Sequence, residues 1–90
     1  KNVILEKICY TDLVYERINK KLNIKLSKRQ IEKMIFEIIE HTEKSDFQKT
    51  GKNIYITNLE KNIRITINSY TNRIITAEKL DKGKNPKTAC

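Results

Sequence analysis

Hydrophobic residues in the first half of the chain recur with the period of an α-helix. Val14, Ile18 and Leu22 repeat at every fourth position and predict a helix over about residues 12–22. A stronger repeat predicts a second helix over about residues 28–42, with an apolar stripe of Ile31, Met34, Ile35, Ile38 and Ile39. Both helices would therefore turn one apolar face toward a shared core.

Polar residues at the ends of these segments support the predicted helices. Thr11 can cap the first helix, and Asn23 is a plausible end for it. Ser27 and Gln30 match a capping box, in which each side chain satisfies a backbone amide near the other residue. The segment over residues 3–8 is compatible with either a turn of helix or a short strand, and its pattern does not decide between them.

In the second half of the chain the apolar period changes from 3.6 to two. This alternation predicts strands over about residues 53–57, 62–68 and 73–78, although the adjacent Ile74 and Ile75 leave the buried face of the third strand open. Connections this short favour antiparallel hairpins. The predicted fold class is therefore α+β, with two N-terminal helices packed on a three-stranded antiparallel meander in the order ααβββ. The expected core consists of Ile31, Met34, Ile35, Ile38, Ile54, Ile56, Ile63, Ile65 and Ile67.

The composition describes one small domain and excludes several classes of protein. Ninety residues support a single core, which we place over residues 1–80, followed by a disordered lysine-rich tail over residues 81–90. No apolar run approaches the roughly 18–20 residues of a membrane span, and the first ten residues are too charged for a signal peptide. Cys9, Cys90 and the single histidine fit no metal-ligand spacing, so we expect no metal and no cofactor. So few cysteines favour a reducing, cytoplasmic location.

The charge balance indicates an anionic partner. Nineteen basic and eleven acidic residues give a net charge of +8, and the pI is about 9.6. The excess lies in residues 47–78 and 79–90, each of which carries +3, while residues 24–46 are neutral. An alternative explanation is genomic, because Lys, Ile and Asn supply 39 of the 90 residues, as an AT-rich coding sequence would.

The polar side of the predicted sheet carries residue types that bind phosphate. If Ile63, Ile65 and Ile67 face the helices, the side chains between them face away. Because guanidinium groups and hydroxyls bind and position phosphate, the predicted phosphate-binding residues are Lys52, Arg64, Thr66, Arg73, Thr76 and Arg17. The candidates for moving protons are Tyr55, Glu78 and His41, a phenol, a carboxylate and an imidazole.

Each of these candidates also has a structural explanation. Threonine and arginine on a strand can simply form a solvated sheet face. His41 falls where a histidine complements the dipole at the C-terminus of a helix. Glu78 can be a solvated carboxylate at a strand end, and Arg17 can pair with Glu16 or Asp12 on its own helix instead of reaching the sheet.

Several blocks of the sequence resemble a small bacterial family known as domain of unknown function 3781. The resemblance covers roughly residues 8–80, and its most specific parts are residues 51–55, which begin GKN and end in an aromatic residue, 64–69 and 74–77. The family carries no assigned activity. Its layout in turn looks like the RelE/barnase/colicin group of metal-independent ribonucleases, many of them toxins, which implies a ribonuclease-like fold.

These observations predict an RNA-directed cytoplasmic protein, with metal-independent endoribonuclease activity of toxin type as the catalytic form. Arg64, Arg73 and Lys52 would then neutralise the reacting phosphate. The alternative is a non-catalytic module that binds nucleic acid or an acidic protein, as an antitoxin-like or phage-type inhibitor would. The expected partner is RNA or another polyanion, with no membrane, and exposed sheet edges would allow a homodimer.

Overall fold

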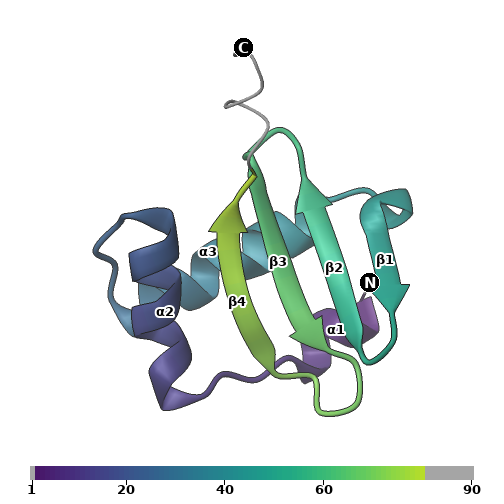
Figure 1. Ribbon diagram of the computed structural model, residues 1–90, viewed down its shortest axis with the longest axis horizontal. Helices are drawn as coiled ribbons and strands as arrows, with labels where there is room; N and C mark the ends of the chain where they lie inside the picture. The colour runs from purple at the N-terminus through teal and green to yellow at the C-terminus, as the bar shows by residue number, and fades with distance from the viewer. Residues whose placement is uncertain (1, 81–90) are drawn as a thin grey trace.

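The computed structural model describes residues 2–80, with side chains from residue 4 onward. The predicted tail over residues 81–90 therefore lies outside the described residues. Three α-helices and a 3₁₀ helix precede four strands (Figure 1). Their bounds are α1 Asn2–Lys7, α2 Asp12–Leu22, α3 Lys28–His41, η1 Lys44–Asp46, β1 Phe47–Thr50, β2 Asn53–Asn58, β3 Ile63–Asn68 and β4 Ile74–Lys79.

The strands form one antiparallel meander in the order β1-β2-β3-β4. The register pairs Tyr55 of β2 with Thr66 of β3, and Thr66 with Thr76 of β4. Between Thr66 and Ile67 the register with β4 shifts, because Ile75 is an extra residue that bulges out of the ladder. The α+β class and the antiparallel meander are confirmed.

The helices cover only one face of this sheet. Figure 1 shows α1 and α3 behind the strands and α2 alongside β4, so that no described helix crosses the face turned toward the viewer. Helix α2 packs closely on β4, and α1 and α3 contact each other. We call the uncovered side the open face of the sheet.

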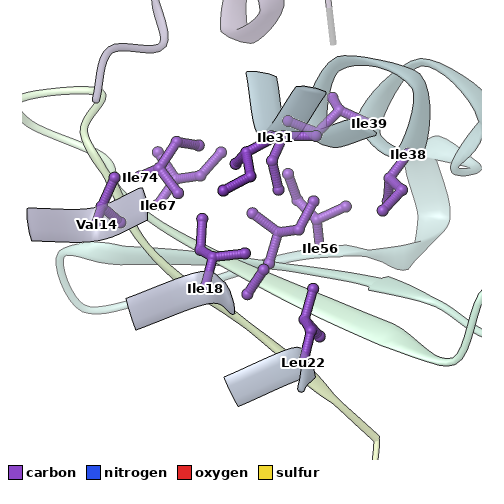
Figure 2. Packing of buried hydrophobic residues seen from close by; sticks show 12 residues of the cluster. Val14, Ile18, Leu22, Ile31, Ile38, Ile39, Ile56, Ile67 and Ile74 are labelled. Carbon is purple, nitrogen blue, oxygen red and sulfur yellow. The ribbon is translucent and has the colours of Figure 1, made fainter. Parts of the chain in front are cut away.

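The core lies between the helices and the opposite side of the sheet (Figure 2). Isoleucines from α2, α3, β2, β3 and β4 supply most of it, and the buried hydrophobic residues are Val14, Ile18, Leu22, Ile31, Ile35, Ile38, Ile39, Ile56, Ile65, Ile67, Ile74 and Ala77. Met34, Ile54 and Ile63, which we expected inside the core, are only partly buried and pack against its rim. The core prediction was otherwise correct for its members on α3, β2 and β3.

One strand was not predicted from the sequence, and the structure assigns one segment that the sequence left open. The sheet has a fourth strand, β1, because Phe47–Thr50 pairs antiparallel with β2. The segment over residues 3–8 is helical, as α1. The predicted three-stranded meander with two helices was therefore wrong in its count, and the correct order among the described α-helices and strands is αααββββ.

Most of the predicted capping residues lie at the helix ends and act as expected. Ser27 and Gln30 form both bonds of the capping box, and Asn23 ends α2 in the left-handed region with φ 57°. Thr11 occupies the N-cap of α2, but its side chain makes no capping hydrogen bond, so that part of the prediction was wrong. None of the helices between residues 2 and 80 is long and apolar enough to cross a membrane.

Candidate nucleic-acid interface

Strand alternation places polar side chains of all four strands together on the open face. Ile56, Ile65 and Ile67 are fully buried on the helix side, so the residues between them point the other way. The register then aligns two rows across the open face. One row consists of Gln48, Tyr55, Thr66 and Thr76, and the other of Thr57, Arg64 and Glu78.

The bulge at Ile75 determines which β4 side chains reach this face. Ile74 is buried in the core, and without an extra residue strict alternation would also turn Thr76 and Glu78 toward the core. Ile75 absorbs one position, so that Thr76 lies opposite Thr66 and Glu78 lies opposite Arg64. The adjacent isoleucines that made β4 ambiguous in the sequence are the site of this irregularity.

Arg64, the second residue of β3, makes two side-chain contacts on the open face. Its Nη2 donates a hydrogen bond of 2.9 Å to Oε2 of Glu78, and its guanidinium carbon lies 5.6 Å from the centroid of the Tyr55 ring. The other carboxylate oxygen of Glu78 is 4.0 Å from Nζ of Lys21 on α2. Because 43% of the Arg64 side chain is still exposed, the guanidinium is held in place and remains open to an anion.

We call Arg64 and its neighbours Tyr55, Glu78 and Lys21 the Arg64 cluster. Two polar atoms in or beside this cluster lack a hydrogen-bond partner among the described residues. The Nε of Arg64 and the Oγ1 of Thr76 are both buried, and neither has a hydrogen-bond partner within residues 2–80. Thr66, between them, is only 7% exposed. Buried polar atoms without partners are costly in a native protein. The protein itself therefore leaves two polar atoms beside Arg64 and Thr66 unsatisfied.

A second group of basic residues lies where β4 meets α2. Arg17 and Arg73 both line a hollow of about 320 Å³. Arg17 reaches the sheet, because its Nη1 donates a hydrogen bond of 3.2 Å to the carbonyl oxygen of Ile75. This contact decides between the two explanations of Arg17, since the described residues contain no ion pair between Arg17 and its helix neighbours.

Lys52 belongs to the same end of the sheet as Arg73. It lies in the turn between β1 and β2, and its carbonyl oxygen accepts hydrogen bonds from the backbone amide and the hydroxyl of Ser69. Ser69 begins the turn between β3 and β4, so the two turns are joined. Lys52 is thus at the margin of the open face, separated from the Arg64 cluster by the length of β3.

His41 lies apart from the other candidates. It is the last residue of α3, on the helix side of the sheet, and its Nδ1 is 2.8 Å from the carbonyl oxygen of Glu37. Its hollow is lined by acidic residues, among them Glu43, Asp46 and Glu60. Of the three candidates for moving protons, only Tyr55 and Glu78 lie on the open face, while His41 occupies the C-terminal end of α3, as its structural explanation expected.

Two contributors to the site were missed in the sequence. Lys21 contacts Glu78 from α2, and Asn53 donates a hydrogen bond of 3.3 Å from Nδ2 to the hydroxyl of Tyr55. The alternation of β2 places Asn53 on the open face with Tyr55, which was an available signal. For Lys21 there was none, because its position depends on how α2 packs on β4.

Two tyrosines with raised pKa values, Tyr10 and Tyr15, lie among the helices. Tyr10 and Tyr15 stack at 5.5 Å between ring centroids, away from the open face. Burial, the hydrogen bond to Glu32 and nearby carboxylates raise the pKa of Tyr15 to about 12, and burial also raises the pKa of Tyr10.

Among the described residues, no group of three or more His, Cys, Asp or Glu side chains could hold a metal ion.

These features define a small α+β domain with a one-sided antiparallel sheet. The chain belongs to the family described as protein of unknown function DUF3781, which matches residues 2–78. No curated protein and no solved structure matches it. The family resemblance is thus confirmed, while the further likeness to RelE and barnase has no support from these comparisons.

Proposed function

We propose that this domain binds single-stranded RNA on the open face of its sheet. The observation that carries the proposal is the Arg64 guanidinium, positioned over the Tyr55 ring on a face that no described helix covers. An aromatic ring on an open sheet can stack on an unpaired base, and an adjacent guanidinium can bind the phosphate beside it. Thr66 and Thr76 lie in the same row as Tyr55, but both are largely shielded, so Arg64 and Tyr55 supply the accessible binding groups.

The distribution of basic residues supports a strand that runs along β3. Arg64 is near one end of β3, and Asn68, Arg73 and Lys52 are near the other. Asn68 follows Arg64 by four positions along β3, which corresponds to about 13 Å. An extended single strand fits this path better than a duplex, whose bases are already stacked and paired.

Cleavage is the catalytic form of the same proposal, and it has one observation in its favour. Tyr55 and Glu78 both contact Arg64, which brings a phenol, a carboxylate and a guanidinium together. Against it, the Glu78 carboxylate is already engaged by Arg64 and Lys21, and His41 is on the other side of the sheet. We therefore favour binding without cleavage.

Fluorescence anisotropy with a labelled single-stranded RNA, measured over a range of salt concentrations, tests the proposal. Three phosphate contacts should give a slope of log affinity against log salt of about −2, and Arg64→Ala should reduce it by roughly 0.7. Arg29→Ala is the matched control, because Arg29 is an exposed arginine in the first turn of α3, on the helix side. Equal slopes for Arg64→Ala and the wild type would reject the open face as the binding site.

The same RNA, incubated with the protein and resolved on a denaturing gel, tests cleavage. Products that form in the presence of EDTA and disappear with Arg64→Ala would support the catalytic form. Intact RNA at concentrations that saturate binding would support the binding module. No RNA binding at low salt would direct attention to an acidic protein as the partner.

A further inference from the structure

The hollow between α2 and the start of β4 has the properties of a small anion site. Its volume is about 320 Å³, at the lower end of the range for ligand pockets. Arg17 and Arg73 both line it, together with the hydroxyl-bearing Thr11 and Thr71. No acidic side chain of the described chain is among its lining residues.

Both guanidiniums in this hollow have donors to spare. Nη1 of Arg17 donates to the carbonyl oxygen of Ile75, which fixes the position of the Arg17 guanidinium. Its other N–H groups make no hydrogen bond within residues 2–80. The Arg73 side chain makes no hydrogen bond or ion pair with any residue between 2 and 80. Two guanidiniums that line the same hollow, of which Arg17 is held in place, match a doubly charged phosphomonoester better than a phosphodiester, which carries a single charge.

The surroundings of the hollow favour a nucleotide over a bare phosphate ion. Leu13, Val14 and Ile75 provide an apolar wall. Tyr70 precedes Thr71 in the turn between β3 and β4; it is not itself a lining residue, and it is 74% exposed. An exposed aromatic side chain beside a phosphate site can stack on a base.

The hollow is also continuous with the open face. Asn68 lines the hollow and, by strand alternation, belongs to the same face as Arg64 and Thr66. Its Oδ1 accepts hydrogen bonds from the amides of Tyr70 and Thr71, which ties the turn to the end of β3. A strand that follows β3 from Arg64 would thus arrive at the hollow.

We infer that this hollow binds a phosphomonoester, and that the terminal phosphate of a single-stranded RNA is the group it receives. The inference rests on the proposed function for the source of the phosphate, and on the hollow itself for the phosphate chemistry. The domain would then recognise the end of a strand as well as its backbone.

The two parts are tested separately on the full chain. In the first arm, adenosine 5′-monophosphate, adenosine and inorganic sulfate are titrated into ¹⁵N-labelled protein and followed by NMR. We expect the monophosphate to shift the signals of Arg17, Thr71 and Arg73, while adenosine does not. Sulfate that shifts the same signals with equal affinity would show a general anion site and overturn the nucleotide reading.

In the second arm, anisotropy compares one RNA sequence with a 5′-phosphate, a 3′-phosphate or hydroxyls at both ends. Two charge-assisted contacts should make one phosphorylated form bind roughly tenfold more tightly than the hydroxyl form. Arg73→Ala should abolish this preference, and Arg29→Ala should retain it. Because Arg17 also holds the Ile75 carbonyl, Arg17→Ala is interpreted only together with its thermal melt.

The outcomes separate the inference from the proposed function. Nucleotide shifts without RNA binding would support a free nucleotide as the source of the phosphate and reject the RNA proposal. RNA binding without preference for a terminal phosphate, and without nucleotide shifts at Arg17 and Arg73, would overturn the inference and leave the RNA proposal intact.

Discussion

Arg64 and Glu78 face each other across β3 and β4 because Ile75 adds one residue to the β4 strand. The hydrogen bond from Arg64 Nη2 to Glu78 Oε2, 2.9 Å long, lies on the open face. Beside Arg64, the negative charge that would repel a phosphate is the Glu78 carboxylate, and this same carboxylate holds the Arg64 guanidinium in place. In the free protein, Glu78 positions Arg64 and also competes with any phosphate for it.

Glu78→Gln should strengthen the binding of single-stranded RNA. The substitution releases Arg64 from its ion pair and removes a negative charge beside the bound strand. Ion pairs at a protein surface contribute about 0.2–1 kcal/mol, so the gain should be roughly 1.4- to fivefold. Anisotropy at fixed salt measures it.

Glu60→Gln is the control for this prediction. Glu60 is exposed in the turn between β2 and β3, so its substitution changes the net charge equally without touching Arg64. An equal gain in both variants would mean that total charge, and not the Arg64–Glu78 pair, determines affinity. Weaker binding by Glu78→Gln would instead make Glu78 a positioning residue that Arg64 requires.

Ile65→Ala should destabilise the domain strongly. Ile65 is fully buried at the centre of the sheet, and its truncation loses transfer free energy and leaves a cavity, at a cost of about 2–5 kcal/mol. Ile63→Ala, on the same strand but only partly buried, should cost clearly less. Urea unfolding followed by circular dichroism compares the two, and equal losses would contradict the burial that separates them.

The sequence pattern identified the elements that bury a periodic apolar face. Helices α2 and α3 and strands β2 and β3 each turn isoleucines toward one core, so their periodicity reports their structure. Strand β1 offers no such signal. Phe47 is its only apolar residue, and its other three residues are exposed, because an edge strand is defined by backbone pairing with β2 and needs little burial.

The candidate site was predictable only within single strands. Alternation correctly grouped Tyr55, Arg64 and Thr66 on one face, since that rule needs no knowledge of neighbouring strands. The pairing of Arg64 with Glu78 depends on a bulge, and a one-residue shift in register is invisible to local patterning. His41 was proposed for the site only because an imidazole is chemically suited to moving protons. Its helix, α3, packs on the other side of the sheet, so His41 does not reach the open face.

Gly51→Ala should weaken the β1–β2 hairpin. Gly51 has φ 61°, and a Cβ built at this position meets nothing within 4 Å, so the cost comes from the backbone conformation alone. For an L-residue in the left-handed region this is about 1 kcal/mol. Urea unfolding measures it, with Gly51→Asn as the comparison.

Asparagine tolerates this conformation, as Asn23, Asn62 and Asn72 do elsewhere in the chain. The asparagine variant should therefore lie between the wild type and Gly51→Ala. An alanine variant as stable as the wild type would show that the turn adopts another conformation in solution.

The Tyr15→Phe variant should lose less of its free energy of unfolding than the wild type as the pH rises above 10. The hydroxyl of Tyr15 donates a hydrogen bond of 2.6 Å to Oε2 of Glu32, and burial together with this bond raises the pKa of Tyr15 from 10.0 to about 12. A tyrosine whose pKa is raised by folding stabilises the domain fully below pH 10. That stability is lost as the pH rises from about 10 through about 12, because the unfolded chain releases the proton first.

Urea unfolding at intervals between pH 8.5 and about 11.5 measures this dependence, and absorbance at 295 nm reports tyrosinate directly. Tyr70→Phe is the control, because Tyr70 is 74% exposed and donates no side-chain hydrogen bond among the described residues. The wild type and Tyr70→Phe should lose stability in parallel above pH 10, while Tyr15→Phe declines less steeply. Tyr10, stacked on Tyr15 and also raised in pKa, accounts for a remaining slope. Identical slopes for all three proteins would show that the Tyr15–Glu32 bond does not persist in solution.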